Sequence, residues 1–383
     1  MLTRLKLLTA GESHGLALTG ILEGVPSGVA LTPEDFARQL KRRRHGHGRS
    51  ARQLLEVDDV VVCGGVRYGR TTGAPVCVRV DNREAPRWSN TLSPWPVDEP
   101  VAKNSVPRPG HADRAGMIKY DLDDVRDVLE RASARETAMR VALSVVCRSI
   151  LQSCGVVVGS HVVQIGQIRS NENVTDVAAA TALADASPVR CLSSTDSARM
   201  VDAIDSAAAA GETLGGVFII VVTGVPIGLG SYTQWDRRLN ARLGGAMLSI
   251  PSVKSVGFGD GAALAATPGT EAHDGFIVDE RGARLSSNHA GGLEGGMSNG
   301  ADVVIEVACK PLSTLPGGLP SMNMATGVAA RGLVERSDVC AVAAASIVGE
   351  AMACLILCDA LLEKFGGDSL AQVQRHLGSG FGA

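Results

Sequence analysis

The longest apolar stretch of the chain, Val339 to Leu362, restricts the fold more than any other segment. Its composition predicts a helix that is hydrophobic nearly all round, which is typical of a helix inside a protein core. Glu350 and Asp359 interrupt the stretch, and an ionised side chain is costly inside a lipid bilayer. We therefore interpret it as a buried helix and not as a membrane span. Two glycines that follow Lys364 predict its end.

Strands and helices are mixed along the rest of the chain, without a strict strand–helix–strand repeat. Apolar runs predict strands over 5–9, 57–66, 74–80, 155–168, 216–222 and 301–308. Helical periodicity and capping signals predict helices from Thr32 and over 123–151, 176–184, 197–210 and 236–248. This order predicts an α+β fold with antiparallel sheets. With 383 residues, the chain can bury a large core in one or two domains.

The composition indicates a folded globular chain, since 45% of its residues are hydrophobic and 20% are charged. Only 3% are aromatic, so side chains that could stack on nucleic-acid bases are scarce. Nine cysteines without a C-x-x-C pair favour reduced thiols in a cytoplasmic protein over disulfides or a zinc site. The first residues include no long apolar run and no small-residue cleavage site, so we expect no secretion signal.

A basic loop that leads into a helix, Asn104 to Arg140, is the first candidate site. His111 follows Pro109 and Gly110, and a histidine in such a loop suits proton transfer better than core packing. Helical periodicity from Asp123 would place Arg131 and Arg135 on one face. These arginines can line an anion site. They can also form an ordinary solvated face that pairs with acids one turn away.

A second basic run, Arg38 to Arg52, contains seven Lys or Arg in fifteen residues, and no acid occurs between Asp35 and Glu56. In a chain of formal net charge −3, such a run is a local positive field that can gather anions or nucleic acid. The alternative is a cationic helix end favoured by the helix dipole. His45 and His47 have no acid or cysteine close by, so we expect no metal site there.

Several shorter motifs remain open to two interpretations. The G-x-S-x-G pattern around His14 begins too close to the N-terminus for a hydrolase nucleophile, which leaves site-lining side chains or turn chemistry. The glycine-rich segment 286–300 can let a ligand approach the backbone or be a flexible loop. Residues 310–314, KPLST, can grip a phosphate or form a turn. Asp338 can cap the last long helix or act in a site. Gly257 to Ala262 matches a dinucleotide fingerprint only weakly, because Pro268 stops any crossover helix.

Taken together, these motifs resemble the chorismate synthase family, in the family's order and from the N-terminus to about Asp368. The resemblance is carried by AGESHG (10–15), RRRHGHGRSAR (42–52), RPGHAD (108–113), KYDLDDVRDVLERASARETAMRVA (119–142), GLGSY (228–232), GGLEGGMSNG (291–300), KPLST (310–314) and RSDVC (336–340). The resemblance implies one domain over 1–383, a βαβ sandwich of antiparallel sheets around a helical layer.

The resemblance also implies a lyase of the shikimate pathway, which eliminates phosphate from 5-enolpyruvylshikimate 3-phosphate in a trans-1,4 sense to give chorismate. Such enzymes need reduced FMN, with NADPH as a candidate reductant, although no net redox change occurs. A cytoplasmic homotetramer is implied, with no nucleic-acid or membrane partner. The competing hypotheses are a nucleic-acid binder that uses the second basic run and an NAD(P)-dependent Rossmann oxidoreductase.

Matching positions assign roles to individual residues. His14 would protonate the departing phosphate, His111 would serve the protonation state of the flavin, and Asp338 would act with the flavin in removing the C6 proton. Arg43, Arg49, Arg108 and Arg135 would bind the substrate anions or NADP. The implied FMN contacts are Arg131, Ala132, Ser133, Pro251, Ser252, Gly295, Lys310, Pro311, Leu312, Ser313, Thr314 and Arg336.

The chain departs from the family pattern at a few of these places. Many members read His-Asp-Pro-Cys where this chain has Ser337-Asp338-Val339-Cys340, with Pro and Arg where Ala343 and Ala344 stand. Pro251-Ser252 replaces a frequent Gln-Ala next to the flavin, and His47 replaces a common Tyr. A proline has no N–H and no polar side chain, so Pro251 cannot make a side-chain hydrogen bond there.

Overall fold

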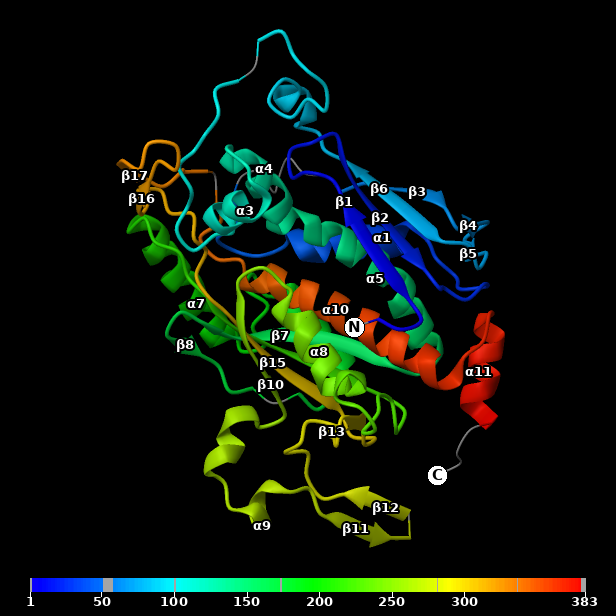
Figure 1. Cartoon of the computed structure of the whole chain (residues 1–383). Coiled ribbons are helices and arrows are strands. Elements are labelled where there is room, and N and C mark those ends of the chain that lie inside the picture. Colours follow the sequence, from blue (N-terminus) through cyan, green and yellow to red (C-terminus); the bar gives the residue numbers. More distant parts are fainter. Residues whose placement is uncertain are drawn as a thin grey trace.

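Two antiparallel sheets enclose a layer of helices in this computed structural model, which describes residues 2–50, 58–99, 101–172, 174–280, 282–335 and 337–379 (Figure 1). The first sheet has the strand order β1 (Lys6–Ala10), β2 (Ala17–Glu23), β6 (Val76–Asp81) and β3 (Val60–Gly64). The second has the order β10 (Val253–Phe258), β15 (Val303–Cys309), β9 (Gly216–Thr223), β7 (Val157–Ile165) and β8 (Ile168–Arg169). The predicted βαβ sandwich of antiparallel sheets is confirmed.

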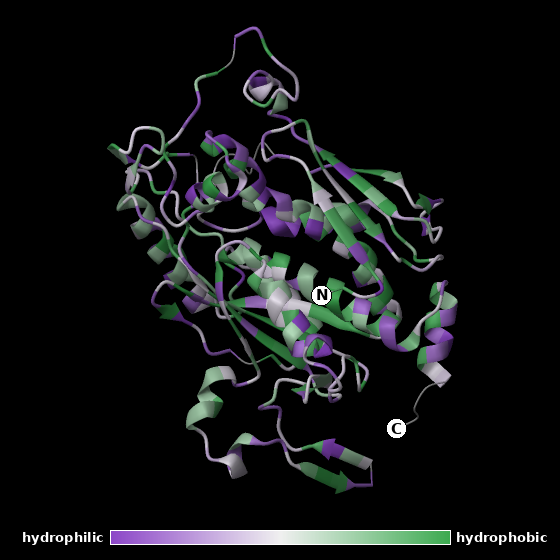
Figure 2. Cartoon of the chain, in the orientation of Figure 1, coloured by the Kyte–Doolittle hydropathy of each residue, from purple (hydrophilic) through white to green (hydrophobic). Residues whose placement is uncertain are grey.

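Helices α1 (Pro33–Arg44), α5 (Thr137–Ser153) and α10 (Val342–Phe365) form the middle layer. Helix α5 packs on β2 and β6, α10 packs on β7 and β9, and the two helices contact each other. Figure 2 shows hydrophobic residues along α10 and along the strands on either side of this layer. The layer therefore joins the inner faces of the two sheets into one core.

Helix α10 is buried along almost its whole length, from Val342 to Leu362. It is a helix long and apolar enough to cross a bilayer, but its most apolar window lies entirely inside the protein. The prediction of a buried core helix is confirmed. A Cβ atom on Gly349 would lie 2.7 Å from the Phe218 ring, so the glycine permits the close approach of α10 to β9.

The remaining elements surround the sandwich. Helices α6 (Val177–Ala186) and α7 (Ser194–Ala209) pack on the second sheet, and α8 (Leu239–Leu248) packs against α10 and β10. The other helices and 3-10 turns are α3 (Asp113–Tyr120), α4 (Val125–Ala132), α9 (Gly269–Ala272), α11 (Leu370–Ser379), η1 (Ala85–Trp88), η2 (Ala134–Glu136), η3 (Trp235–Arg237) and η4 (Gly261–Ala266). Four small hairpins are β4 (Val66–Arg67) with β5 (Arg70–Thr71), β11 (Phe276–Asp279) with β12 (Gly282–Leu285), β13 (Leu293–Glu294) with β14 (Met297–Ser298), and β16 (Pro320–Met322) with β17 (Ala329–Arg331).

The helix predicted over 123–151 is interrupted at Ser133. Its backbone is extended there, with φ −65° and ψ 141°, and its side chain accepts a hydrogen bond from the amide of Arg135. Helix α4 therefore ends at Ala132, and α5 begins only at Thr137. The prediction that Arg131 and Arg135 share one helix face is wrong, because this turn separates them.

Two alternatives from the sequence are excluded by the fold. Asp338 does not cap α10, because Ala341 precedes its first residue and provides no side-chain cap. The weak dinucleotide fingerprint does not lead into a crossover helix, because β10 is followed by the short η4 and pairs antiparallel with β15. Residue 57, the first of the strand predicted over 57–66, lies outside the described residues; within the rest, Val60–Gly64 form β3 and Val66 begins β4.

Asp359 of α10 ties the helix to the segment that leads into β1. Its carboxylate accepts hydrogen bonds from the backbone amides of Thr3, Arg4 and Leu5 at 2.7–2.9 Å, and it pairs with the guanidinium of Arg242 on α8. Asp359 and Leu5 are both fully buried. These contacts connect the last long helix to the segment that precedes β1.

Glu350 of α10, like Asp359, is a fully buried acid. Its carboxylate lies 2.7 Å from Arg42 of α1, 2.7 Å from Arg148 of α5 and 3.4 Å from Arg190. Ser160 of β7 donates a further hydrogen bond at 2.7 Å. Burial alone would raise the pKa of Glu350, but the arginines outweigh this effect and lower it to about 2. One carboxylate thus joins all three central helices and the second sheet.

We expect Glu350→Gln to reduce the free energy of unfolding by about 3–5 kcal/mol, because it leaves several buried arginines without their shared counter-charge. Urea unfolding at pH 7 measures this loss. Glu306→Gln is the matched control, since Glu306 pairs with Arg169 on the exposed surface, and its loss should change stability by less than about 0.5 kcal/mol. Equal effects of the two substitutions would contradict the prediction.

Candidate functional site

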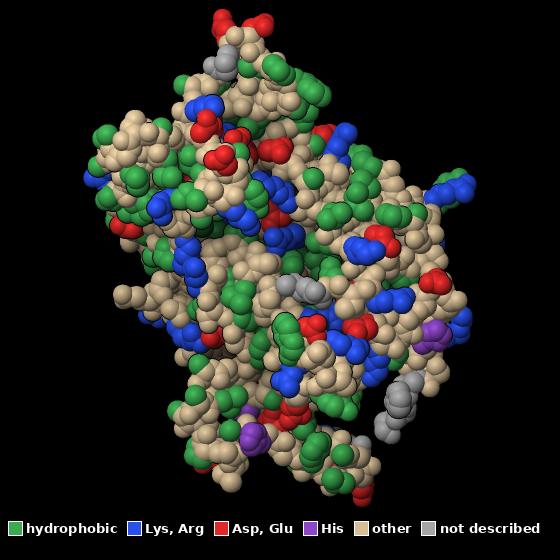
Figure 3. Space-filling view, viewed as in Figure 1, with side chains coloured by type: hydrophobic (Ala, Val, Ile, Leu, Met, Phe, Trp, Pro, Cys, Tyr) green, Lys and Arg blue, Asp and Glu red, His purple; other side chains and the backbone are tan. Residues whose placement is uncertain are grey.

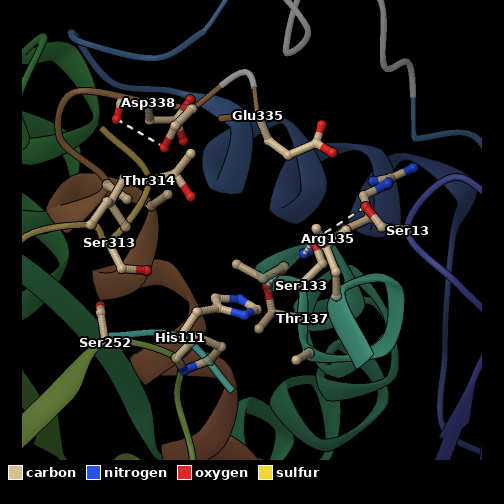
Figure 4. A pocket seen from close by; sticks show the side chains of 18 of the residues that line it. Ser13, His111, Ser133, Arg135, Thr137, Ser252, Ser313, Thr314, Glu335 and Asp338 are labelled. Carbon is tan, nitrogen blue, oxygen red and sulfur yellow. Dashed lines mark hydrogen bonds between the residues drawn. The ribbon is translucent and has the colours of Figure 1, made fainter. Parts of the chain in front are cut away.

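A cavity of about 500 Å³ lies where the start of α10 meets the start of α5 and several loops. Its volume is in the range of small-molecule sites. In Figure 4, Arg135, Ser133 and Thr137 lie on one side of it, Ser313, Thr314 and Asp338 lie on the other, and His111 lies between the two groups at the bottom of the view. Eight separate stretches of sequence line the cavity, and most of the motifs identified in the sequence belong to them.

His14 lines the cavity from the loop between β1 and β2. Its Nδ1 atom lies 3.0 Å from both carboxylate oxygens of Glu130, and its backbone amide donates to Glu130 Oε2 at 2.8 Å. The His14 ring also lies against Trp88, with 4.5 Å between ring centroids. The neighbouring Ser13 accepts a hydrogen bond from Ser133 at 3.2 Å. The imidazole is therefore held on two sides.

Arg108, His111 and Asp113 form a second cluster in the Pro-Gly loop. The buried Asp113 carboxylate lies 2.8 Å from Arg108 Nε and 2.5 Å from His111 Nδ1. It also accepts the Arg108 backbone amide at 3.0 Å. Burial would raise the pKa of Asp113, but its contacts with His111 and Arg108 lower it well below the usual range. The carboxylate thus fixes both an arginine and an imidazole at the cavity wall.

Arg43 and Arg135 approach each other across a third buried acid, Asp58. Arg135 Nη1 lies 2.5 Å from Asp58 Oδ1, and Arg43 Nη1 lies 3.8 Å from Asp58 Oδ2. Arg135 also donates to Asn82 Oδ1 at 3.1 Å, and Arg43 Nε donates to the Thr137 hydroxyl at 3.1 Å. Both guanidinium groups are nearly buried. Their orientation is therefore set before any ligand arrives.

Asp338 and Arg49 meet on the side of the cavity next to α10. Arg49 Nη1 lies 2.7 Å from Asp338 Oδ2, and the backbone amide of Ser50 donates to Asp338 Oδ1 at 2.6 Å. The cavity-lining Ala341, Ala344 and Ala345 come from the first turns of α10 and the residue before it. The small side chains leave room in front of the Asp338 carboxylate. The aspartate thus faces the site, as the second of its two interpretations predicted.

Lys310 is the remaining cation of the wall, on the segment that follows β15. Its Nζ donates to the carbonyl of Gly110 at 2.8 Å, and burial together with the charge of Lys254 lowers its pKa. The Lys310 amide donates to the carbonyl of Ser252 at 2.9 Å, which joins the two predicted flavin segments. Ser252 has a positive φ of 73°. The Thr314 hydroxyl accepts from Arg108 at 3.2 Å.

Most of the residues predicted for the site come together in this one cavity. They are His14, Arg43, Arg49, Arg108, His111, Ala132, Ser133, Arg135, Pro251, Ser252, Lys310, Pro311, Leu312, Ser313, Thr314 and Asp338. Arg336 lies outside the described residues. This convergence accounts for part of the second basic run, since Arg43 and Arg49 line the cavity, whereas Arg42 pairs with Glu350 in the core and Arg38 pairs with Asp35 at the surface.

Two predicted flavin contacts do not line the cavity. Arg131 lies in the last turn of α4, before the break at Ser133, and its guanidinium donates to the Thr9 carbonyl and hydroxyl and to the Gly11 carbonyl. Gly295 lies in the turn between β13 and β14. The glycines of its loop permit close backbone packing: a Cβ on Gly291 would lie 2.2 Å from the amide nitrogen of Gly259. Here the glycine-rich composition reflects packing between loops.

Sequence reasoning missed the three acids that hold the cations, Glu130, Asp113 and Asp58. Asp113 follows His111 by two residues, and that spacing was a usable signal. Glu130 is 116 residues from His14, so only the fold reveals their contact. Trp88 was also missed, although the Pro- and Trp-rich segment around it is long enough to suggest a function.

Comparison with known proteins identifies the family. A family model described as chorismate synthase matches residues 5–362. A solved structure described as a crystal structure of chorismate synthase superimposes with a TM-score of 0.79 at 36% identity, covering 98% of this chain and 97% of the other. The chain belongs to the chorismate synthase family. It is therefore a lyase of the shikimate pathway, and the oxidoreductase and nucleic-acid alternatives are set aside.

Relatives in the chorismate synthase family match along nearly their whole length. The chorismate synthase of Thermobifida fusca is 50% identical over 382 residues, with 97% of each chain covered. That of Streptomyces coelicolor is 49% identical over 386 residues, covering 99% of this chain and 98% of its own. The family resemblance derived from the motifs is confirmed.

We expect Asp113→Asn to lower the free energy of unfolding by about 3 kcal/mol at pH 7, because it removes a buried charge that holds the Arg108 guanidinium and the His111 ring. The pKa of Asp113 is lower in the folded than in the unfolded protein. Asp113 therefore contributes its full share of the free energy of unfolding above the pKa of an unfolded aspartate, about 3.9, and this share is lost as the pH falls below that value. The difference from the wild type should therefore shrink between pH 5 and pH 3 in urea unfolding.

Asp123→Asn is the control for this pH series, because Asp123 pairs with Lys103 at the surface at 2.6 Å. Its unfolding curve should stay close to that of the wild type across the series. A difference between wild type and Asp113→Asn that stayed constant down to pH 3 would contradict the assignment.

Proposed function

We propose that this cavity is the active site, in which the chain eliminates phosphate from 5-enolpyruvylshikimate 3-phosphate to give chorismate. One observation carries the proposal: His14, His111 and Asp338 line the same cavity as four arginines and a lysine. The reaction removes a proton from C6 and a phosphate from C3, so it needs a proton acceptor, a proton donor and cations. The cavity wall offers all three.

The arginines are suited to hold the anionic groups of the substrate, which has two carboxylates and a phosphate. A guanidinium binds such groups through two parallel hydrogen bonds. Arg43, Arg108 and Arg135 are each already oriented by a buried acid, so little conformational freedom is lost when the substrate binds. We assign these three and Arg49 to the substrate, and the same groups would bind the phosphates of NADP.

His14 and Asp338 are the groups proposed for proton transfer. His14 would donate a proton to the departing phosphate, which lowers the charge that the leaving group must bear. Asp338, oriented by Arg49 and the Ser50 amide, would take up the proton that leaves C6. Both side chains line the cavity from different segments, so one substrate can meet both.

The composition of the wall fits reduced FMN as well as the substrate. Lys310 and the hydroxyls of Ser133, Ser252, Ser313 and Thr314 are suited to a phosphate and to polar ring atoms. Lys310 has a lowered pKa, and an added anion would relieve the repulsion that contributes to it. When bound, reduced flavin supplies the electron-rich ring that this elimination requires. His111, oriented by Asp113, would hold a proton beside that ring. Pro251 would contribute only packing.

We also propose that the chain assembles into a homotetramer. Exposed apolar side chains on the first sheet and on the β11–β12 hairpin, both visible in Figure 3, are suited to burial between subunits of a homotetramer. Among them are Leu8, Ile21, Val61, Phe276 and Val278. The mass in solution, from analytical ultracentrifugation, tests this.

All nine cysteines are free thiols, which supports a cytoplasmic protein.

An anaerobic assay tests the proposed function directly. We expect the purified chain to release one phosphate and form one chorismate per substrate when chemically reduced FMN is present, and to be inactive with oxidised FMN alone. Phosphate and the chorismate absorbance would be followed together. A parallel reaction with oxidised FMN and NADPH measures whether the chain reduces its own flavin. Absence of turnover with reduced FMN would overturn the proposal.

We expect His111→Ala to lower kcat by a factor of about 10²–10⁴, the usual contribution of a proton-transfer group. The fold should persist, because His111 is only half-buried and lies in a loop; circular dichroism and urea unfolding verify this. His45→Ala is the control, since His45 contacts the Ser187 carbonyl and does not line the cavity. Full activity of His111→Ala would remove His111 from the mechanism.

A further inference from the structure

We propose that Glu130 is a positioning residue of the reaction, which holds the His14 ring so that its Nδ1 carries a proton and its Nε2 is the atom that serves the substrate. The inference rests on the proposed role of His14 as proton donor. Glu130 itself does not line the cavity, so it acts through His14 and not on the ligand.

The contacts between the two residues leave little freedom to the imidazole. Both Glu130 oxygens lie 3.0 Å from His14 Nδ1, and Oε2 also accepts the His14 backbone amide at 2.8 Å. The Glu130 carbonyl accepts the backbone amide of Ser13 at 3.1 Å. One residue therefore fixes the main chain and the ring of the Ser13–His14 pair, although 116 positions separate it from His14.

Neighbouring charges keep Glu130 ionised. Its side chain is almost fully buried, which alone would raise the pKa of the carboxyl group, but hydrogen bonds and charge from His14 and Arg126 lower the pKa instead. Arg126 Nη1 lies 3.1 Å from Glu130 Oε1, and its Nη2 lies 2.8 Å from Glu335. An ionised carboxylate only accepts hydrogen bonds, so the atom it contacts, His14 Nδ1, must carry the proton.

Trp88 closes the remaining side of this arrangement. Its ring lies against the His14 ring and beneath the guanidinium of Arg126, 4.9 Å from the ring centroid. The two partners of Glu130, His14 and Arg126, thus both lie against the same indole. This packing restricts rotation of the His14 ring about its bond to the chain and shields the carboxylate from water.

The consequence for catalysis follows from the geometry of an imidazole. Its two nitrogens lie on opposite sides of the ring, so contact of Nδ1 with Glu130 assigns Nε2 to the cavity. Before proton transfer, the carboxylate stabilises the protonated ring; afterwards it stabilises the neutral form that keeps its proton on Nδ1. An amide in place of an orienting carboxylate favours the wrong tautomer, which lowers kcat by about 10⁴ in the serine protease triad.

The test compares Glu130→Gln with Glu136→Gln in the anaerobic assay. Glu130 and Glu136 are both buried and each pairs with an arginine four residues away in sequence, but among these two only Glu130 contacts a histidine. We expect Glu130→Gln to lower kcat by at least 100-fold, with KM within about threefold of the wild type, because the substrate-binding arginines are untouched. Glu136→Gln should keep kcat within about threefold. Equal kcat losses in the two variants would overturn the inference.

A spectroscopic readout separates positioning from general loss of structure. The chain contains eight histidines, and ¹⁵N-histidine labelling with His14→Ala as the assignment control identifies the His14 ring signals. The neutral ring should carry its proton on Nδ1 in the wild type and on Nε2, at least in part, in Glu130→Gln. A wild-type ring with its proton on Nε2 would overturn the inference without any variant. Retained activity in His14→Ala would instead refute the proposed function of His14, so the two failures are distinguishable.

Discussion

The contact of Glu350 with three arginines is the interaction on which the arrangement of the middle layer depends. It joins α10 to α1 and α5 at a point where all four charges are shielded from water. Arg42 and Arg43 are consecutive, so the residue that anchors α1 in the core also sets the direction of the next side chain into the cavity. The ion pairs of the core thus help to orient a cationic side chain of the site.

Acidic side chains also orient the histidines and arginines of the cavity. Glu130, Asp113, Asp58 and Asp338 each hold a histidine or an arginine that lines the wall. The acids fix the donors in place before substrate binds, so little reorganisation is needed when charge develops in the reaction. They also reduce the mutual repulsion of several cations in a small volume. The charged side chains that an anionic ligand would contact are therefore already oriented by their acidic partners.

Local signals in the sequence predicted much of the fold and most of the site. The capping box at Thr32 and Asp35, the alternation in β15 and the end of α10 before Gly366 are all decided within a few residues, and the structure has them as expected. The site residues were accessible because each lies in a distinctive motif. The break at Ser133 was missed, because the apolar periodicity continues across it and only the backbone turn separates the two helices.

The partners of the site residues could not be predicted in this way. Glu130 and Asp58 occur in segments with an ordinary mixture of charges, and their roles come from contacts across the fold. The same reason explains why the sequence left two interpretations of Asp338 open. A cap is a local interaction, whereas the observed partners, Arg49 and Ser50, are almost 290 residues away in sequence. Glycine-rich loops were ambiguous because ligand approach and backbone packing both require a missing side chain.

The contact of Asp359 with residues 3–5 has a consequence for synthesis on the ribosome. Residues 3–5, which lead into β1, are held by a helix residue that is made about 355 residues later, so these contacts form only after α10 has been synthesised. Leu18 and Leu22 on one sheet, and Phe218 and Ile220 on the other, belong to the same core as α10, which is incomplete until that point. The last steps of folding must therefore follow the synthesis of α10, and apolar segments made earlier can be bound by chaperones until then.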